Sequence, residues 1–156
     1  MPAQAQRWGY SYLALCGALA LHVADEALTG FLDVYNPSAL AIRERLPSLP
    51  IPVFTFRVWL TGLILAVIVL LCLAPAVFAR RRGMRVLTYP FGILMIGNAL
   101  GHVGGSVYLG RFMPGVYSSP LLFAASVWLL RETVRLETKN EKRRTNRSGR
   151  QPMRSD

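Results

Sequence analysis

Three ionisable side chains lie within one short apolar stretch of the sequence. His22, Asp25 and Glu26 all occur in "LHVADEAL", residues 21–28. His22 and Glu26 are four residues apart, so on a helix they share one face, about 6 Å apart along the axis. A histidine beside a carboxylate can transfer protons, hold a metal ion or join helices through hydrogen bonds. Which of these uses applies depends on what surrounds the stretch.

A second polar set lies in "GNALGHVGGSVYLGRF", residues 97–112. Asn98, His102 and Ser106 follow one another at steps of four, so a helix would align them on one face. A stripe of glycines runs beside them, at Gly97, Gly101 and Gly105. Small residues at this spacing let another helix approach closely. We therefore expect this helix to have a close-packing seam alongside a polar face.

The apolar residues are gathered in four blocks, which is typical of a polytopic membrane protein. The chain has 156 residues, is 53% hydrophobic and carries a formal net charge of +10. The blocks predict spanning helices, since each has about 20 residues or more, and they lie at about 8–32, 53–79, 86–109 and 116–136. We expect an all-α bundle of four transmembrane helices. Basic residues segregated between and after apolar blocks argue against nucleic-acid binding.

Basic residues predict the orientation of the helices, because Lys and Arg collect on the cytoplasmic side of a membrane. "RRRGMR", residues 80–85, joins the second and third blocks, and the chain after Leu130 is basic throughout. Both segments should be cytoplasmic, which also places the amino terminus there. The loops at about 33–52 and 110–115 then face outward.

Two segments lie outside the predicted four-helix domain of residues 1–136 or at its surface. Within the first outer loop, "SALAIRERL" predicts a short helix on the membrane surface. The tail, residues 137–156, predicts a disordered basic segment. It either contacts anionic lipid headgroups or serves only as a topology signal.

Cys16 and Cys72 both fall in apolar blocks and are expected to be packing residues.

Depth in the membrane links the two polar sets. The first and third spans both run outward from the cytoplasm. His22 and Asn98 lie near the middle of their spans, and Glu26 and His102 lie about one turn further out. An acid in the bilayer costs about 2.5–3.5 kcal/mol, so these groups should face the bundle interior. Matching depth predicts one shared site.

The candidate site residues divide by expected role. Five could act in catalysis: His22, Asp25, Glu26, Asn98 and His102. Three could contact a substrate: Thr29, Ser106 and Arg111, of which Arg111 could bind an anion or only snorkel to the surface. Three could hold a metal: His22, Glu26 and His102. Two histidines and one carboxylate with open positions suit a divalent metal such as zinc or non-haem iron.

"HVADE" (residues 22–26), "NALGH" (98–102) and "RFMPGVYSSPLLF" (111–123) resemble the HXXEE family of small bacterial membrane proteins. That family is named for a His-x-x-Glu-Glu motif in its first helix. The resemblance covers nearly the whole chain except the tail. It implies a helical fold in the bacterial inner membrane, with these polar residues at its functional centre, and it supplies no reaction. The first acid is Asp25 here, whose shorter side chain favours Glu26 as the ligand or proton carrier.

Three functions remain open. The favoured one is an enzyme that acts on a lipid-like substrate by acid–base or metal-assisted chemistry, which predicts a pocket that opens near Glu26 and His102. The second is proton-coupled transport or binding of a small molecule, which predicts a polar path to both surfaces and, for transport, a homodimer. The third is a structural role in holding helices together, which predicts that every polar group is bonded and that no cavity exists.

Overall fold

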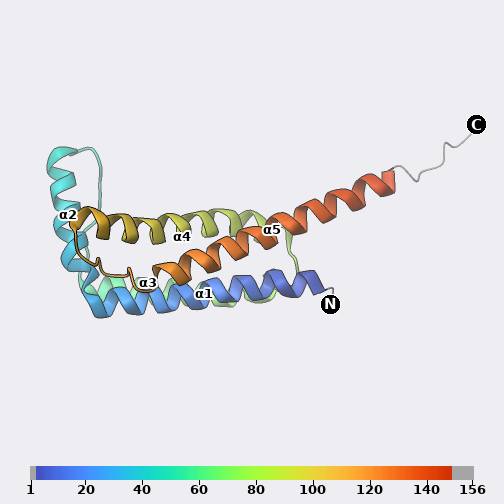
Figure 1. The fold of residues 1–156 in the computed structure, drawn as a ribbon, viewed down its shortest axis with the longest axis horizontal. Coiled ribbons are helices and arrows are strands. Elements are labelled where there is room, and N and C mark those ends of the chain that lie inside the picture. The colour runs from blue at the N-terminus through green and yellow to red at the C-terminus, as the bar shows by residue number, and fades with distance from the viewer. Residues whose placement is uncertain (1–2, 149–156) are drawn as a thin grey trace, which may run out of the picture.

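The computed structural model describes residues 3–148, and these residues form α-helices without any strand (Figure 1). The all-α prediction is confirmed. The helices are α1 (Ala3–Thr29), α2 (Phe31–Arg45), α3 (Phe56–Phe78), α4 (Arg82–Leu109) and α5 (Ser119–Ser148).

Four of these helices run along one common axis, and α2 stands across the end of the bundle (Figure 1). α1 and α4 run in one direction, while α3 and α5 return in the other. α1 packs against α3 and α5, and α5 packs in turn against α4. The carboxyl ends of α1 and α4 therefore meet α2 and the start of α5 at the same end of the molecule.

Three helices have the length and apolar composition needed to cross a membrane: Gln6–Thr29, Phe56–Phe78 and Arg82–Leu109. α5, which covers most of the fourth predicted span, is not clearly a fourth candidate. Its apolar run ends early, because Arg131 and Glu132 follow Leu130 directly. The described chain thus has three clear candidate spans, whereas the sequence predicted four.

The first predicted span ends earlier than expected, at Thr29. Gly30 has a φ of 77°, in the left-handed region that glycine adopts without strain, and it separates α1 from α2. The helix predicted at residues 38–46 is correspondingly longer, since α2 begins at Phe31 directly after this glycine. The turn at Gly30 directs α2 across the end of the bundle (Figure 1).

The basic tail was predicted to be disordered from residue 137, which is wrong for residues 137–148. α5 remains helical to Ser148 and projects beyond the other helices (Figure 1). No glycine or proline interrupts the sequence from Leu121 to Ser148, so nothing breaks the helix. The Tyr89 hydroxyl also donates to Glu137 Oε2 at 2.6 Å and ties α5 to α4. The rest of the predicted tail, 149–156, lies outside the described residues.

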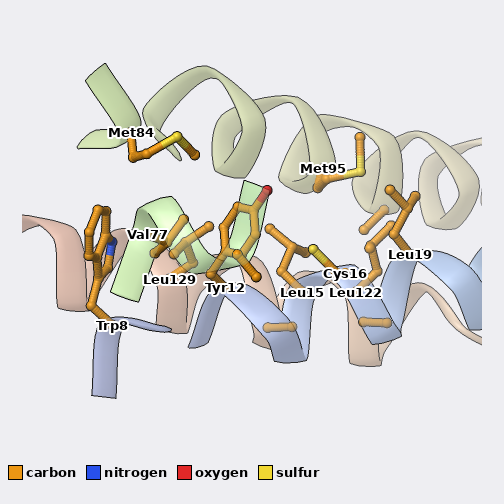
Figure 2. Close-up of a cluster of buried hydrophobic side chains, with 14 of the residues drawn as sticks. Trp8, Tyr12, Leu15, Cys16, Leu19, Val77, Met84, Met95, Leu122 and Leu129 are labelled. Atoms are coloured by element: carbon orange, nitrogen blue, oxygen red, sulfur yellow. The ribbon is translucent and has the colours of Figure 1, made fainter. Parts of the chain in front are cut away.

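The apolar core lies between α1, α3, α4 and α5 (Figure 2). Trp8, Tyr12, Leu15 and Leu19 follow one another at helical spacing on one face of α1. They pack with side chains from α3, α4 and α5, among them Val77, Met84, Met95, Leu122 and Leu129. Cys16 is buried in this core, as predicted for a packing residue, whereas Cys72 is exposed on α3.

The sequence predicted that α4 packs through a seam of three glycines, Gly97, Gly101 and Gly105. A Cβ on either of the first two would meet nothing within 4 Å, and a Cβ on the third would meet only the Met113 side chain. The close approach is instead at Gly92, where a Cβ would lie 2.8 Å from a Leu130 methyl carbon on α5. The buried face of α4 passes through Ala99 and His102, which leaves most of the predicted seam outside.

Candidate functional site

His22 and Glu26 of α1 meet His102 of α4 inside the bundle. Glu26 Oε1 lies 3.0 Å from His102 Nε2 and 3.6 Å from His22 Nε2. The two imidazole rings are 4.8 Å apart between centroids and nearly perpendicular, at 77°. All three side chains are buried, and His22 is fully inaccessible. The structure thus joins the two polar sets that the sequence placed at matching depth.

The buried face of α1 explains why these groups meet. Apart from Ser11, that face is apolar from Trp8 to Leu19, and the next buried polar residue is His22, three residues later. On α4, the buried face passes through Met95 and Ala99 before it reaches His102. The polar centre therefore lies directly on the apolar core. Water is excluded on that side, so electrostatic interactions at the centre are stronger than in solvent.

Ser118, just before α5, connects His22 to Asp25. The Ser118 backbone N–H donates to Asp25 Oδ2 at 2.9 Å, and the Ser118 hydroxyl donates to the same oxygen at 2.7 Å. Ser118 Oγ also lies 2.8 Å from His22 Nδ1. Because the hydroxyl proton goes to Asp25, His22 Nδ1–H must donate to Ser118 Oγ. This network assigns a lone pair to His22 Nε2, which has no hydrogen-bond partner and faces Glu26.

Gly115 closes the centre from the loop between α4 and α5. Its φ of 85° is in the left-handed region, where other residues are strained. A Cβ at this position would lie 2.8 Å from His102 Cε1 and 3.0 Å from Glu26 Cγ. The Ser119 hydroxyl donates to the Gly115 carbonyl at 2.8 Å and holds the turn. Glycine is therefore required here for two reasons: it adopts this φ without strain, and it leaves room for His102 and Glu26.

A cavity of about 410 Å³ adjoins Glu26 at the α2 end of the bundle. Its polar lining side chains are Glu26, Asp33 and Asn36, and its aromatic ones are Phe31, Phe54, Phe56 and Trp59. A volume of this size suits a small-molecule ligand. The Phe31 ring lies 5.7 Å from the His102 ring, so the aromatic wall reaches the polar centre.

Hydrogen bonds hold the outer wall of the cavity in place. Asn36 Nδ2 donates to the Phe54 carbonyl at 2.9 Å, and Phe54 N–H donates to Asn36 Oδ1 at 3.1 Å. The Tyr35 hydroxyl donates to the Pro52 carbonyl at 3.0 Å. These bonds fix α2 against the segment that leads into α3. The cavity is therefore a preformed part of the fold.

A family model described as "Protein of unknown function with HXXEE motif" matches residues 13–129. The chain belongs to the HXXEE family. The match covers both halves of the polar centre and Ser118, and it confirms the resemblance found in the sequence. No curated protein and no solved structure matches the chain.

The polar residues of the HXXEE motif make two separate sets of contacts in this structure. Its first and last positions, His22 and Glu26, meet at the centre with His102. Its middle acid, Asp25, is half-buried and points to Ser118. The short aspartate suffices for this contact, since Ser118 comes to it from the loop. Asp25 thus holds Ser118 beside His22.

The remaining predicted polar residues lie around the centre. Asn98 is half-buried beside the His22 ring. The Ser106 hydroxyl donates to the His102 carbonyl at 2.7 Å and accepts from the Met113 backbone N–H at 2.8 Å. Ser106 therefore ties the α4–α5 loop to the helix turn that carries His102.

Thr29 and Arg111 lie further from the centre. The Thr29 hydroxyl donates to the Asp25 carbonyl of its own helix at 2.6 Å. Arg111 is exposed just after α4. Neither residue lines the cavity beside Glu26, and neither does Ser106. The substrate contacts expected of these three residues stay predictions.

Ser118 and the aromatic wall of the cavity were not predicted from the sequence. The available signal for Ser118 was the pair of serines that follows the Pro114–Gly115 turn. A second buried acid, Glu132 of α5, was not predicted either; it is 1% exposed and lies outside the group of His22, Glu26 and His102. Arg135 Nη1 lies 2.8 Å from Glu132 Oε1, and Arg7 Nε lies 3.9 Å from the same oxygen.

Proposed function

We propose that this chain is a membrane-embedded enzyme that holds a divalent metal ion between His22, Glu26 and His102 and acts on a hydrophobic substrate in the adjoining cavity. One observation carries the proposal: the three side chains are buried, and one ligand atom from each lies within 4.8 Å of the others. Two histidines and one carboxylate are the protein ligands of many catalytic zinc and non-haem iron sites, which keep positions open for water or substrate.

The geometry around the centre fits such an ion. Zinc bonds of about 2.0–2.2 Å place neighbouring tetrahedral ligands roughly 3.4 Å apart. The 3.0 and 3.6 Å separations around Glu26 Oε1 are close to that value, whereas the longest separation among the three ligand atoms, up to 4.8 Å, would have to shorten by a small rotation of an imidazole ring. The His22 Nε2 lone pair is buried without a hydrogen-bond partner. The Ser118–Asp25 pair supplies the outer hydrogen bond that ligating histidines commonly make through their other ring nitrogen.

A bound metal ion would polarise a substrate oxygen or activate a water molecule. The chain's own residues would do the rest. The cavity would orient the substrate against Glu26, and the apolar core would keep bulk water from the inner side. Ser118 would hold the His22 ring with its Nε2 directed at the metal.

The two other functions account for fewer of these features. Transport requires a polar path to both surfaces. On the amino-terminal side of His22, however, the buried face of α1 includes Tyr12, Leu15 and Leu19, which leaves no polar path there in the described part of the chain. A structural role requires that every polar group is bonded. Within the described residues, His22 Nε2 and His102 Nδ1 are buried without hydrogen bonds, and a cavity adjoins the centre.

The proposal includes a fourth membrane span formed by α5. α5 packs along both α1 and α4. Of its two charged interruptions, Arg131 is exposed, whereas Glu132 is buried against the bundle and paired with Arg135, which reduces the cost of that acid in lipid. We propose the bacterial inner membrane, with both termini in the cytoplasm and the cavity on the outer side, since "RRRGMR" lies at the opposite end.

Single-cysteine labelling tests this topology. We expect Ser48→Cys, in the α2–α3 loop, to react with an impermeant maleimide in intact spheroplasts. We expect Thr138→Cys, in α5, to react only after permeabilisation. Both variants would carry alanine in place of Cys16 and Cys72. Labelling of both positions from outside would show that α5 does not cross the membrane.

Elemental analysis tests the metal centre. The full chain, purified in dodecyl maltoside without chelators, is expected to hold close to one divalent ion per molecule. His22→Ala and His102→Ala should each weaken binding by at least roughly 100-fold, because loss of outer-shell partners alone costs 10–100-fold. Thr29→Ala is the control, since the Thr29 hydroxyl bonds only to its own helix. Unchanged metal in either histidine variant, or no metal in folded wild type after reloading, would contradict the proposal.

A further inference from the structure

We infer that the cavity beside the metal centre recognises an organic cation, a molecule that carries an amino or quaternary ammonium group. The inference names the substrate class of the proposed enzyme, and only the word "substrate" rests on that proposal. The observation behind this inference is that two carboxylates, Asp33 and Glu26, line the same cavity as four aromatic rings. The chain as a whole is strongly basic.

The charge of the cavity lining is opposite to that of the chain. The chain has 18 Lys and Arg residues against 8 Asp and Glu. The cavity nevertheless has two carboxylates, Glu26 and Asp33, and no Lys or Arg in its lining. Within the described residues, no basic side chain lies within ion-pair distance of Asp33. Asp33, exposed in the first turn of α2, is the lining carboxylate that lies outside the group of His22, Glu26 and His102.

The aromatic rings at the cavity contact one another in a continuous row. Phe31 and Trp59 lie 5.8 Å apart between centroids at 27°, and Phe56 and Trp59 lie 6.0 Å apart at 41°. On the other side of Phe31, Tyr35 is stacked at 5.5 Å and leads to Phe54 at 6.0 Å. Ammonium groups bind to the faces of such rings, and tryptophan is the strongest of them.

The hydrogen-bonding groups of the lining also disfavour an anion. Both ends of the Asn36 amide are engaged with the Phe54 backbone, and a carboxylate can only accept. Apart from an ion at the proposed metal centre, a phosphate group would therefore meet negative charge with few donors to compensate. This separates a simple cationic amphiphile from a phospholipid headgroup, in which the ammonium is accompanied by a phosphate.

Ligand-observed NMR titration of the full chain in dodecyl maltoside tests the inference with three soluble probes. Choline carries the cation, 3,3-dimethylbutan-1-ol is its neutral isostere, and phosphocholine adds a phosphate. We expect choline to bind at least about tenfold more tightly than either of the others. Asp33→Asn and Trp59→Leu should each remove most of that preference. Trp128→Leu is the matched control, since Trp128 is half-exposed on α5 and does not line the cavity.

The outcomes separate this inference from the proposed function. Equal binding of choline and its neutral isostere, or a preference that survives both Asp33→Asn and Trp59→Leu, would overturn the inference whatever the metal content. Tighter binding of phosphocholine would overturn it in favour of a headgroup that includes phosphate. His102→Ala should lose the metal and keep the preference for choline. A sample without metal that still prefers choline would contradict the enzyme proposal alone.

Discussion

Gly115→Ala is expected to lose both the metal ion and about 2–5 kcal/mol of stability. Two costs combine at this position. A left-handed φ of 85° costs a non-glycine residue about 1–2 kcal/mol. The new Cβ would also lie 2.8–3.0 Å from the His102 ring and from Glu26 Cγ, and overpacking of this kind costs about 1–3 kcal/mol. Since neither side chain can move without separating the ligand atoms, the collision should alter the centre itself.

Gly110→Ala is the control, because it has the cost of the left-handed backbone without the cost of overpacking. Gly110 also has a left-handed φ, of 62°, but a Cβ there would meet nothing within 4 Å. We expect this variant to lose only about 1–2 kcal/mol and to bind metal normally. Thermal unfolding in detergent and elemental analysis of both variants make the comparison. If the two variants behave alike, Gly115 contributes only its backbone conformation and does not shape the centre.

Periodicity and hydropathy were enough to predict the central contact. The spacing of His22 and Glu26 defined a helix face, and the apolar blocks defined the depth of that face in the span. The same reasoning placed His102 at the matching level. These features depend on local geometry, which a single helix determines without its neighbours.

Other features depended on tertiary contacts and could not be predicted this way. The rotation of α4 is set by burial of Ala99 and His102, so the predicted glycine seam fell largely on the outer face. The loop that carries Ser118 is held by Ser106, through a hydrogen bond to the Met113 backbone. No spacing rule relates these residues, because their separation reflects the path of a loop.

A pocket near Glu26 and His102 was predicted, but its aromatic lining was missed for a different reason. Phe56 and Trp59 appeared in the sequence as ordinary residues at the edge of an apolar span. Their role follows from the turn at Gly30, which folds α2 across the bundle and brings Phe31 against Trp59. An aromatic residue contributes equally to a lipid-facing surface or a binding wall, and only the position of α2 distinguishes the two.

Ser118→Ala is expected to weaken metal binding by about 10–100-fold with little loss of fold. The substitution removes the oxygen that accepts from His22 Nδ1–H and donates to Asp25. Without it, the His22 ring can rotate and can carry its proton on either nitrogen, so Nε2 is no longer held as a free ligand. Metal titration monitored by elemental analysis or calorimetry measures the change.

The neighbouring serine provides the matched control. Ser119 is buried and donates only to the Gly115 carbonyl. Ser119→Ala should therefore cost about 1 kcal/mol of stability and leave metal affinity within about twofold of wild type. Ser118→Thr keeps a hydroxyl at the same place and should restore most of the affinity. Equal metal affinity in Ser118→Ala and Ser119→Ala would remove the positioning role from both Ser118 and Asp25. The middle acid of the motif would then act on the loop backbone alone, through the Ser118 N–H that both variants retain.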